Sequence, residues 1–302
     1  PQTKSNDGNW FYHPEDRSLE GIRLTHQPSP HIGDYGCISF MPQEGTPYSD
    51  VNQRWSGFRP EEAIIRPDYM KINLLRYKST FELSPTERGA CMRVKYNGNL
   101  IPRFAVMPVS GEYGFEVDVL NSRVYGYTTS IVKNIAVNFK MYFVLEFNCK
   151  IDISNTVFTC ESGEMQNAAF DSLINSGHGS GINLALTDRN VEIKIATSYI
   201  SRKQAVINME NELVDYDFNQ IKSMANEKWE ELLSKVKVEC YSDDQMRTFY
   251  SCLARVFLYP AKSYEIDEEG RPVHYCPHNG EIAEGISYTN NGFWDTFRTV
   301  YP

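Results

Sequence analysis

The chain has 302 residues, 41% of them hydrophobic and 13% aromatic, and a formal net charge of −9 at pH 7. This content is ample for a packed core and excludes a chain that is disordered as a whole. The negative charge argues against nonspecific nucleic-acid binding, which needs a basic surface. Because no run of about eighteen apolar residues is present, we expect no membrane-spanning segment. The chain begins at Pro1 without an initiator Met or an apolar leader, so we interpret it as a processed protein or a piece of a longer one.

The first two thirds of the chain have the periodicity of β-structure. From about residue 69 to residue 200, apolar and polar residues alternate, for example at residues 91–96 and 191–195. Turn signals rich in Gly, Asn and Asp separate these runs at residues 97–99, 110–112, 175–177 and 187–190. Many short strands at close spacing predict an antiparallel β-sandwich over residues 1–200.

The period changes to three and four after Ser201, which predicts helices. Asp217 is the expected N-cap of an amphipathic helix with the apolar residues Phe218, Ile221, Ala225, Trp229, Leu232, Leu233 and Val236. A second helix is expected from Ser242, which opens a capping-box sequence, until Pro260 ends it. Its apolar face consists of Met246, Phe249, Leu253, Val256 and Phe257. We therefore divide this part into a linker helix at residues 201–241 and the start of a further domain at residues 242–302.

The cysteines and the glycine-rich run carry no strong signal for a site. The seven cysteines have neither CxxC spacing nor a paired-ligand pattern, which argues against a zinc site. We expect most of them to be buried thiols. A disulfide between Cys149 and Cys160 stays open. The run Gly-His-Gly-Ser-Gly at residues 177–181 is followed by neither Lys-Ser/Thr nor a helix start, so it predicts a sheet loop rather than a phosphate loop.

The last ten residues before Pro302 hold the strongest candidate site. Trp294 offers a flat ring for the apolar face of a pyranose, Asp295 accepts hydrogen bonds from hydroxyl groups, and Arg298 donates them. The alternative is an aromatic core segment with one buried Asp–Arg pair, and the residues alone leave both open. The histidines at positions 26, 31, 274 and 278 are expected in loops and lack the spacing of a helical metal site.

A series of motifs resembles one known family in its order along the chain. They are residues 21–36, with Thr25-His26 and Gly33-Asp34-Tyr35-Gly36, then residues 58–69, 83–90, 248–253 and 264–275, and finally residues 285–301 with Trp294-Asp295-Thr296. This succession resembles glycoside hydrolase family ninety-two, the calcium-dependent exo-acting α-mannosidases. The match is to the branch with Gln-Pro-Ser-Pro after His26 rather than Leu-Ser-Gly, which leaves the linkage specificity open.

The resemblance implies a fold and a chemistry. The fold is mainly β: an antiparallel β-sandwich followed by linker helices and the first part of an (α/α)6 catalytic barrel. The chemistry is hydrolysis of terminal α-linked mannose with inversion, aided by calcium. In that family the acid, the base and most calcium ligands come from the barrel beyond the Trp-Asp-Thr segment. The resemblance thus assigns no catalytic or metal-ligating residue up to Pro302, and we expect the 302-residue span alone to be inactive.

The same resemblance implies roles for five residues and a set of partners. Trp294 and Asp295 are expected to contact the terminal mannose, with Arg298 in support. His26 and His31 are further candidate substrate-binding residues, in a segment expected near the interface of the two domains. The implied partners are a mannose-containing glycan and the rest of the catalytic domain, and the implied location is secreted, periplasmic or cell-surface. The alternative hypothesis is a noncatalytic β-sandwich module for carbohydrate binding or assembly.

Overall fold

The structure is a computed structural model that describes most of the chain: residues 2–3, 15–24, 36–109, 111–129, 138–159, 165–167, 175–178, 181–258 and 260–288. Within these ranges every pair of strands is antiparallel, and the strands form two large sheets and one small sheet. No helix among these residues is long and apolar enough to cross a membrane.

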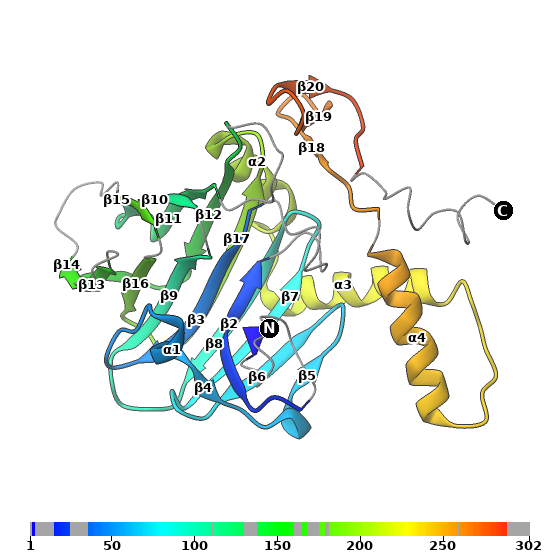
Figure 1. The fold of residues 1–302 in the computed structure, drawn as a ribbon, viewed down its shortest axis with the longest axis horizontal. Coiled ribbons are helices and arrows are strands. Elements are labelled where there is room, and N and C mark those ends of the chain that lie inside the picture. Colours follow the sequence, from blue (N-terminus) through cyan, green and yellow to red (C-terminus); the bar gives the residue numbers. More distant parts are fainter. Residues whose placement is uncertain are drawn as a thin grey trace.

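The two large sheets face each other as a sandwich (Figure 1). The first has eight strands: β1 (Gln2–Thr3), β2 (Ser18–Leu24), β3 (Ile38–Glu44), β9 (Pro102–Pro108), β16 (Gly181–Leu186), β13 (Ile151–Thr159) and β14 (Met165–Asn167) in that order, with β4 (Ser56–Gly57) paired to β2. The second has nine: β15 (Asn175–His178), β10 (Glu112–Asp118), β11 (Arg123–Thr128), β12 (Met141–Phe147), β17 (Asn190–Ser198), β8 (Gly89–Tyr96), β7 (Ser79–Pro85), β6 (Met70–Leu74) and β5 (Ile64–Ile65). Short helical turns at α1 (Val51–Arg54) and η1 (Pro60–Glu62) lie between β3 and β5.

The alternation that predicted strands puts every second residue into the core between the sheets. On β17 the side chains of Val191, Ile193 and Ile195 are at most 1% exposed, and Glu192 and Lys194 lie on the opposite face. The facing sheet contributes large rings such as Phe104, which stacks on Phe40 with ring centroids 5.7 Å apart. The predicted antiparallel β-sandwich is thereby confirmed.

One predicted turn is wrong. Residues 175–177, whose Asn-Ser-Gly sequence is typical of a turn, lie in β15 and pair with β10 from Tyr113 to Phe115. Ladder hydrogen bonds to the edge of the nine-stranded sheet outweigh the weak local preference of these small polar residues. The glycine-rich run therefore lies partly in strands, because Gly177 belongs to β15 and Gly181 opens β16.

The outer face of the nine-stranded sheet is covered by two helices, α2 (Arg202–Glu212) and α3 (Phe218–Leu233). The predicted N-cap of α3 is confirmed, since the Asp217 carboxylate accepts from the backbone N–H of Gln220 in a capping box. Phe218 and Ile221 are buried in a second apolar cluster with Ala205 and Met209 of α2, and Ala225 is buried as well. Val236, which we expected on the apolar face of this helix, lies beyond its end.

The break between α2 and α3 is a correction to the single linker helix predicted at residues 201–241. Sequence periodicity misses α2 because two of the four residues that it buries are polar, Gln204 and Asn208. Both are hydrogen-bonded, Gln204 Nε2 to the Ile266 carbonyl at 2.6 Å and Asn208 Nδ2 to the Thr197 carbonyl at 2.8 Å. Paired buried amides satisfy the helix interface without leaving an apolar stripe in the sequence.

The chain then leaves the sandwich through α4 (Asp243–Phe257), which stands apart from it, and returns in a small sheet above it (Figure 1). Ser242 caps α4 as predicted, by accepting from the N–H of Gln245. The small sheet, β18 (Tyr264–Ile266), β19 (Pro272–Tyr275) and β20 (Ile282–Glu284), is called the C-terminal hairpin below.

Three of the cysteines in the described ranges, Cys37, Cys91 and Cys149, are buried. Burial raises the pKa of the Cys149 thiol to about 11. Its proposed disulfide partner Cys160 lies outside the described residues.

Candidate functional site

All five predicted site residues lie outside the residues that the structure describes: His26 and His31 in one segment, and Trp294, Asp295 and Arg298 in another. The structure does describe the flanks of both segments. The first is flanked by β2, which ends at Leu24, and by Gly36, and the second is preceded by the C-terminal hairpin up to Tyr288.

These flanks meet at one end of the sandwich. A Cβ atom on Gly36 would lie 2.4 Å from Cβ of Met141, the first residue of β12. Two residues before Met141, the Phe139 ring packs edge-on against Tyr275 of the C-terminal hairpin, with centroids 5.6 Å apart. The hairpin is therefore seated on the same part of the core that Gly36 approaches.

Polar contacts hold the tip of the hairpin in place. Asn138 donates through Nδ2 to the Gly280 carbonyl at 2.8 Å and accepts through Oδ1 from the Tyr275 hydroxyl at 3.2 Å. Gly280 has a φ of +76°, and a Cβ atom there would lie 2.1 Å from Asn138 Oδ1, so this contact requires glycine. His274, which the sequence predicted in a loop, lies in β19 with Nδ1 2.9 Å from the Gly285 carbonyl oxygen.

A buried carboxyl group anchors the base of the hairpin. Glu265 is 3% exposed, and its two oxygens accept from the Tyr199 N–H and from Asn208 Nδ2, each at 2.8 Å. Burial raises the pKa of Glu265, and hydrogen bonds from Ser198, Tyr199 and Asn208 oppose that rise. A raised pKa is typical of a general acid. Here, however, the cavity beside Glu265 has a volume of about 10 Å³, which is too small for a substrate.

Glu265 is therefore an anchor that joins the hairpin to β17 and α2. This anchor was not predicted from the sequence, because Glu265 lies in an acidic run that is typical of a solvated loop. The available signal was the two-residue alternation in Tyr264–Ile266.

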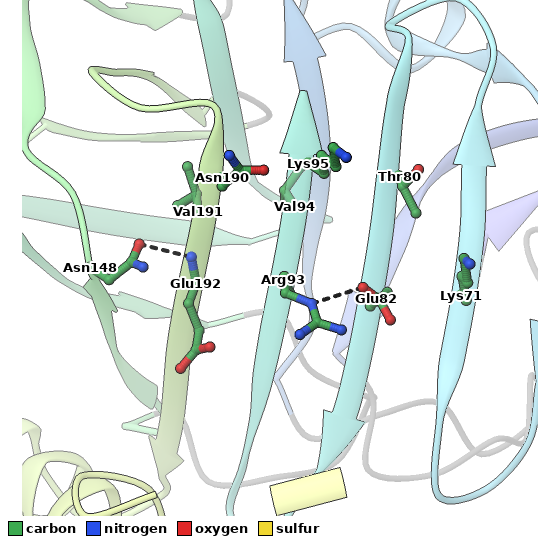
Figure 2. A pocket seen from close by; sticks show the side chains of 10 residues that line it. All are labelled: Lys71, Thr80, Glu82, Arg93, Val94, Lys95, Asn148, Asn190, Val191 and Glu192. Atoms are coloured by element: carbon green, nitrogen blue, oxygen red, sulfur yellow. Dashed lines mark hydrogen bonds and ion pairs between the residues drawn. The ribbon is translucent and has the colours of Figure 1, made fainter. Parts of the chain in front are cut away.

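A groove with a volume of about 530 Å³ lies elsewhere, on the outer face of the nine-stranded sheet (Figure 2). Four residues that lie opposite one another on adjacent strands alternate in charge: Lys71, Glu82, Arg93 and Glu192. Arg93 Nε donates to Glu82 Oε2 at 2.8 Å. Burial raises the pKa of Glu82, but its hydrogen bonds from Arg93 and Tyr69 outweigh that effect and leave the pKa lowered.

Opposite charges on neighbouring strands stabilise a sheet face directly. The guanidinium of Arg93 also lies 4.3 Å above the ring of Phe218, the first residue of α3. We interpret this groove as a structural charge ladder that ties α3 to the sheet.

The described part of the chain contains no group of three or more His, Cys, Asp or Glu side chains that could hold a metal ion. The calcium ion expected from the resemblance therefore stays a prediction.

Comparison with known protein families gives two adjacent matches. Residues 1–198 match the glycosyl hydrolase family 92 N-terminal domain, and residues 204–302 match the glycosyl hydrolase family 92 catalytic domain. A comparison with curated proteins returned no match.

Solved structures agree with these matches. The chain is similar to a family GH92 inverting mannosidase from Bacteroides thetaiotaomicron, with 32% identity and a TM-score of 0.90 over 99% of this chain and 40% of that one. It is also similar in fold to an α-mannosidase of the same family and organism in complex with mannoimidazole, with 20% identity and a TM-score of 0.76 over 93% of this chain and 38% of that one. The chain thus spans less than half the length of these relatives.

Proposed function

Because the chain belongs to glycosyl hydrolase family 92, we propose that it is the N-terminal portion of an inverting, exo-acting α-mannosidase that removes terminal α-linked mannose from glycans. The observation that carries the proposal is the similarity to an inverting mannosidase along 99% of the chain. The match of residues 204–302 to a catalytic domain favours this proposal over a noncatalytic carbohydrate-binding module.

In this proposal the described residues position a wall of the mannose pocket. The C-terminal hairpin is fixed by Glu265 at its base and by Asn138 at its tip, and residues 289–302 follow it directly. Trp294 covers the apolar face of the terminal mannose, Asp295 accepts hydrogen bonds from its hydroxyl groups, and Arg298 supports Asp295.

The acid and base belong to the remainder of the catalytic domain. Inversion requires one carboxylic acid at the leaving oxygen and one carboxylate that activates water on the opposite face of the sugar, roughly 6.5–9.5 Å apart. The 302-residue span alone is then inactive. Calcium dependence is part of the same proposal: chelation with EDTA should abolish turnover, and added calcium should restore it.

The test of the site is Asp295→Ala in the full-length protein. Loss of charge-assisted hydrogen bonds, each worth roughly 1.5–3 kcal/mol, should lower kcat/KM on an aryl α-mannoside by about one to two orders of magnitude. Glu269→Ala is the matched control, because that carboxylate is 62% exposed in the loop of the same hairpin. Unchanged kcat/KM together with a lower melting temperature would assign Asp295 to structure and remove it from the site.

A further inference from the structure

A small aromatic groove lies on the outer face of the nine-stranded sheet, beside the N-terminus of α2. Its volume is about 150 Å³. Its lining residues come from β10, β11, β12 and α2: Gly114, Phe115, Glu116, Tyr125, Gly126, Tyr127, Tyr142 and Arg202. We call it the tyrosine groove. It shares no lining residue with the charge ladder or with the C-terminal hairpin.

The strand register builds this groove. Tyr127 lies between Gly114 on β10 and Tyr142 on β12, so two rings and one glycine form a row across the sheet. A Cβ atom on Gly114 would lie 2.5 Å from the Tyr127 ring. The absence of a side chain at Gly114 therefore lets the Tyr127 ring lie against the sheet and form an apolar floor.

Charged groups hold the rings in position. The Arg202 guanidinium lies 3.7 Å from the centroid of the Tyr125 ring and pairs through both terminal nitrogens with the Glu116 carboxylate. Lys140 Nζ lies 4.2 Å from the centroid of the Tyr127 ring. Cation–π contacts and a two-point ion pair fix the rings before any ligand arrives, which lowers the entropic cost of binding.

The shape and chemistry select the occupant. A cavity of about 150 Å³ holds one six-membered ring and is smaller than the roughly 300–1,000 Å³ typical of pockets for drug-sized molecules. The strands β11 and β12 are paired on both sides, and so is β10 from Glu112 to Phe115, so these strands offer little free edge to a peptide. The surface that the groove exposes is almost entirely apolar, which suits the apolar face of a pyranose. Glu116 and Arg202, which pair with each other, lie beside it.

We propose that the tyrosine groove is an accessory site that binds one pyranose unit of a glycan, separate from the hydrolytic pocket. The proposal rests on the proposed function only for the choice of mannose as the sugar. The groove holds a large glycan on the β-sandwich. Substitutions in the groove should therefore weaken binding to α-mannan and leave the hydrolysis of a small aryl α-mannoside unchanged.

The test is native affinity electrophoresis of the protein in gels containing α-mannan. Tyr127→Ala and Tyr142→Ala should each weaken retardation by about three- to tenfold, as expected for the loss of one aromatic contact. Tyr127→Phe keeps the ring and should retain most of the binding, which separates ring loss from misfolding. Tyr241→Ala is the matched control, because Tyr241 is fully exposed outside the groove, and it should bind as the wild type does.

Three results would overturn the proposal. The first is retardation of Tyr127→Ala and Tyr142→Ala equal to that of Tyr241→Ala. The second is an equal loss of kcat/KM on an aryl α-mannoside, which would place the groove in the hydrolytic pocket. The third is a dimer, detected by light scattering, that only the groove variants lose, because a second copy would then be the occupant. Absence of aryl mannoside hydrolysis in the wild type would contradict the proposed function and leave this binding test intact.

Discussion

The two ends of the helical region differ in what covers their apolar residues. The first half of α3 buries Phe218, Ile221 and Ala225 against the sandwich, whereas no residue of α4 is buried within the described part of the chain. Val256 of α4 is 66% exposed although the helix is strongly amphipathic. An amphipathic pattern thus predicts a helix reliably, but whether its apolar face is covered depends on a partner elsewhere. We infer that α2 and α3 are stabilised by the sandwich and that α4 is not.

Truncation of an aromatic side chain should affect the free energy of unfolding much more in the sandwich than in α4, and this is the largest difference that we expect. Phe104→Ala removes a ring that is 0% exposed and packed against Phe40 and Phe147, so it should lower the free energy of unfolding by about 3–5 kcal/mol. Phe257→Ala in α4, where the ring is 37% exposed, should change it by less than about 1 kcal/mol. Urea unfolding measures both, and equal effects would show that α4 folds together with the sandwich.

Removal of the helix caps should give a smaller difference in stability between α3 and α4. Asp217→Ala breaks the capping box of α3 and should cost about 1 kcal/mol of global stability. Ser242→Ala removes the equivalent hydrogen bond in α4, and because α4 has no buried face it should leave the main unfolding transition unchanged. A shift of that transition by Ser242→Ala would contradict the distinction.

The hairpin anchor should have its own pH dependence. In the folded protein the pKa of Glu265 is raised above 4.5 by burial, so folding favours the protonated carboxyl group. The stability contributed by that group is complete below its unfolded pKa and is lost as the pH rises through the raised pKa. The unfolding free energy of the wild type minus that of Glu265→Gln should therefore fall as the pH rises above 4.5. A difference that grows with pH would mean that the hydrogen bonds from Tyr199 and Asn208 outweigh burial.

The exposed face of α4 should affect association more than stability. Val256→Gln and Met246→Gln should reduce self-association of the 302-residue chain in light scattering and change its unfolding midpoint little, because both side chains are exposed. Lys237→Gln, an exposed change outside the helix, is the control. A wild-type chain that is monodisperse and monomeric at high concentration would contradict the prediction.

The fold was largely predictable from the sequence, and its exceptions have physical causes. Strict alternation, as in Val191 to Ile195, predicted strands because one face of each strand is buried. Helix α2 was not predictable from periodicity, because it buries the amides Gln204 and Asn208, whose partners come from distant segments. Strand β15 was mistaken for a turn because its pairing with β10 is nonlocal.

The site was predictable only in part. Its candidate residues Trp294, Asp295 and Arg298 came from motif resemblance and lie outside the described residues, so they stay predictions. The hairpin anchor depends on a contact between Asn208 and Glu265, 57 residues apart, which no local pattern encodes. The tyrosine groove did have a local signal, the alternating Tyr125-Gly126-Tyr127, but a ring pair on a strand is also typical of ordinary sheet packing.

The central claim is that this chain is part of an inverting α-mannosidase, and proton NMR of the first sugar released tests it most directly. The full-length protein, supplied with calcium and an aryl α-mannoside, should first release β-mannose, which then converts to the equilibrium mixture of anomers. Initial release of α-mannose, or no release of mannose at all, would contradict the account.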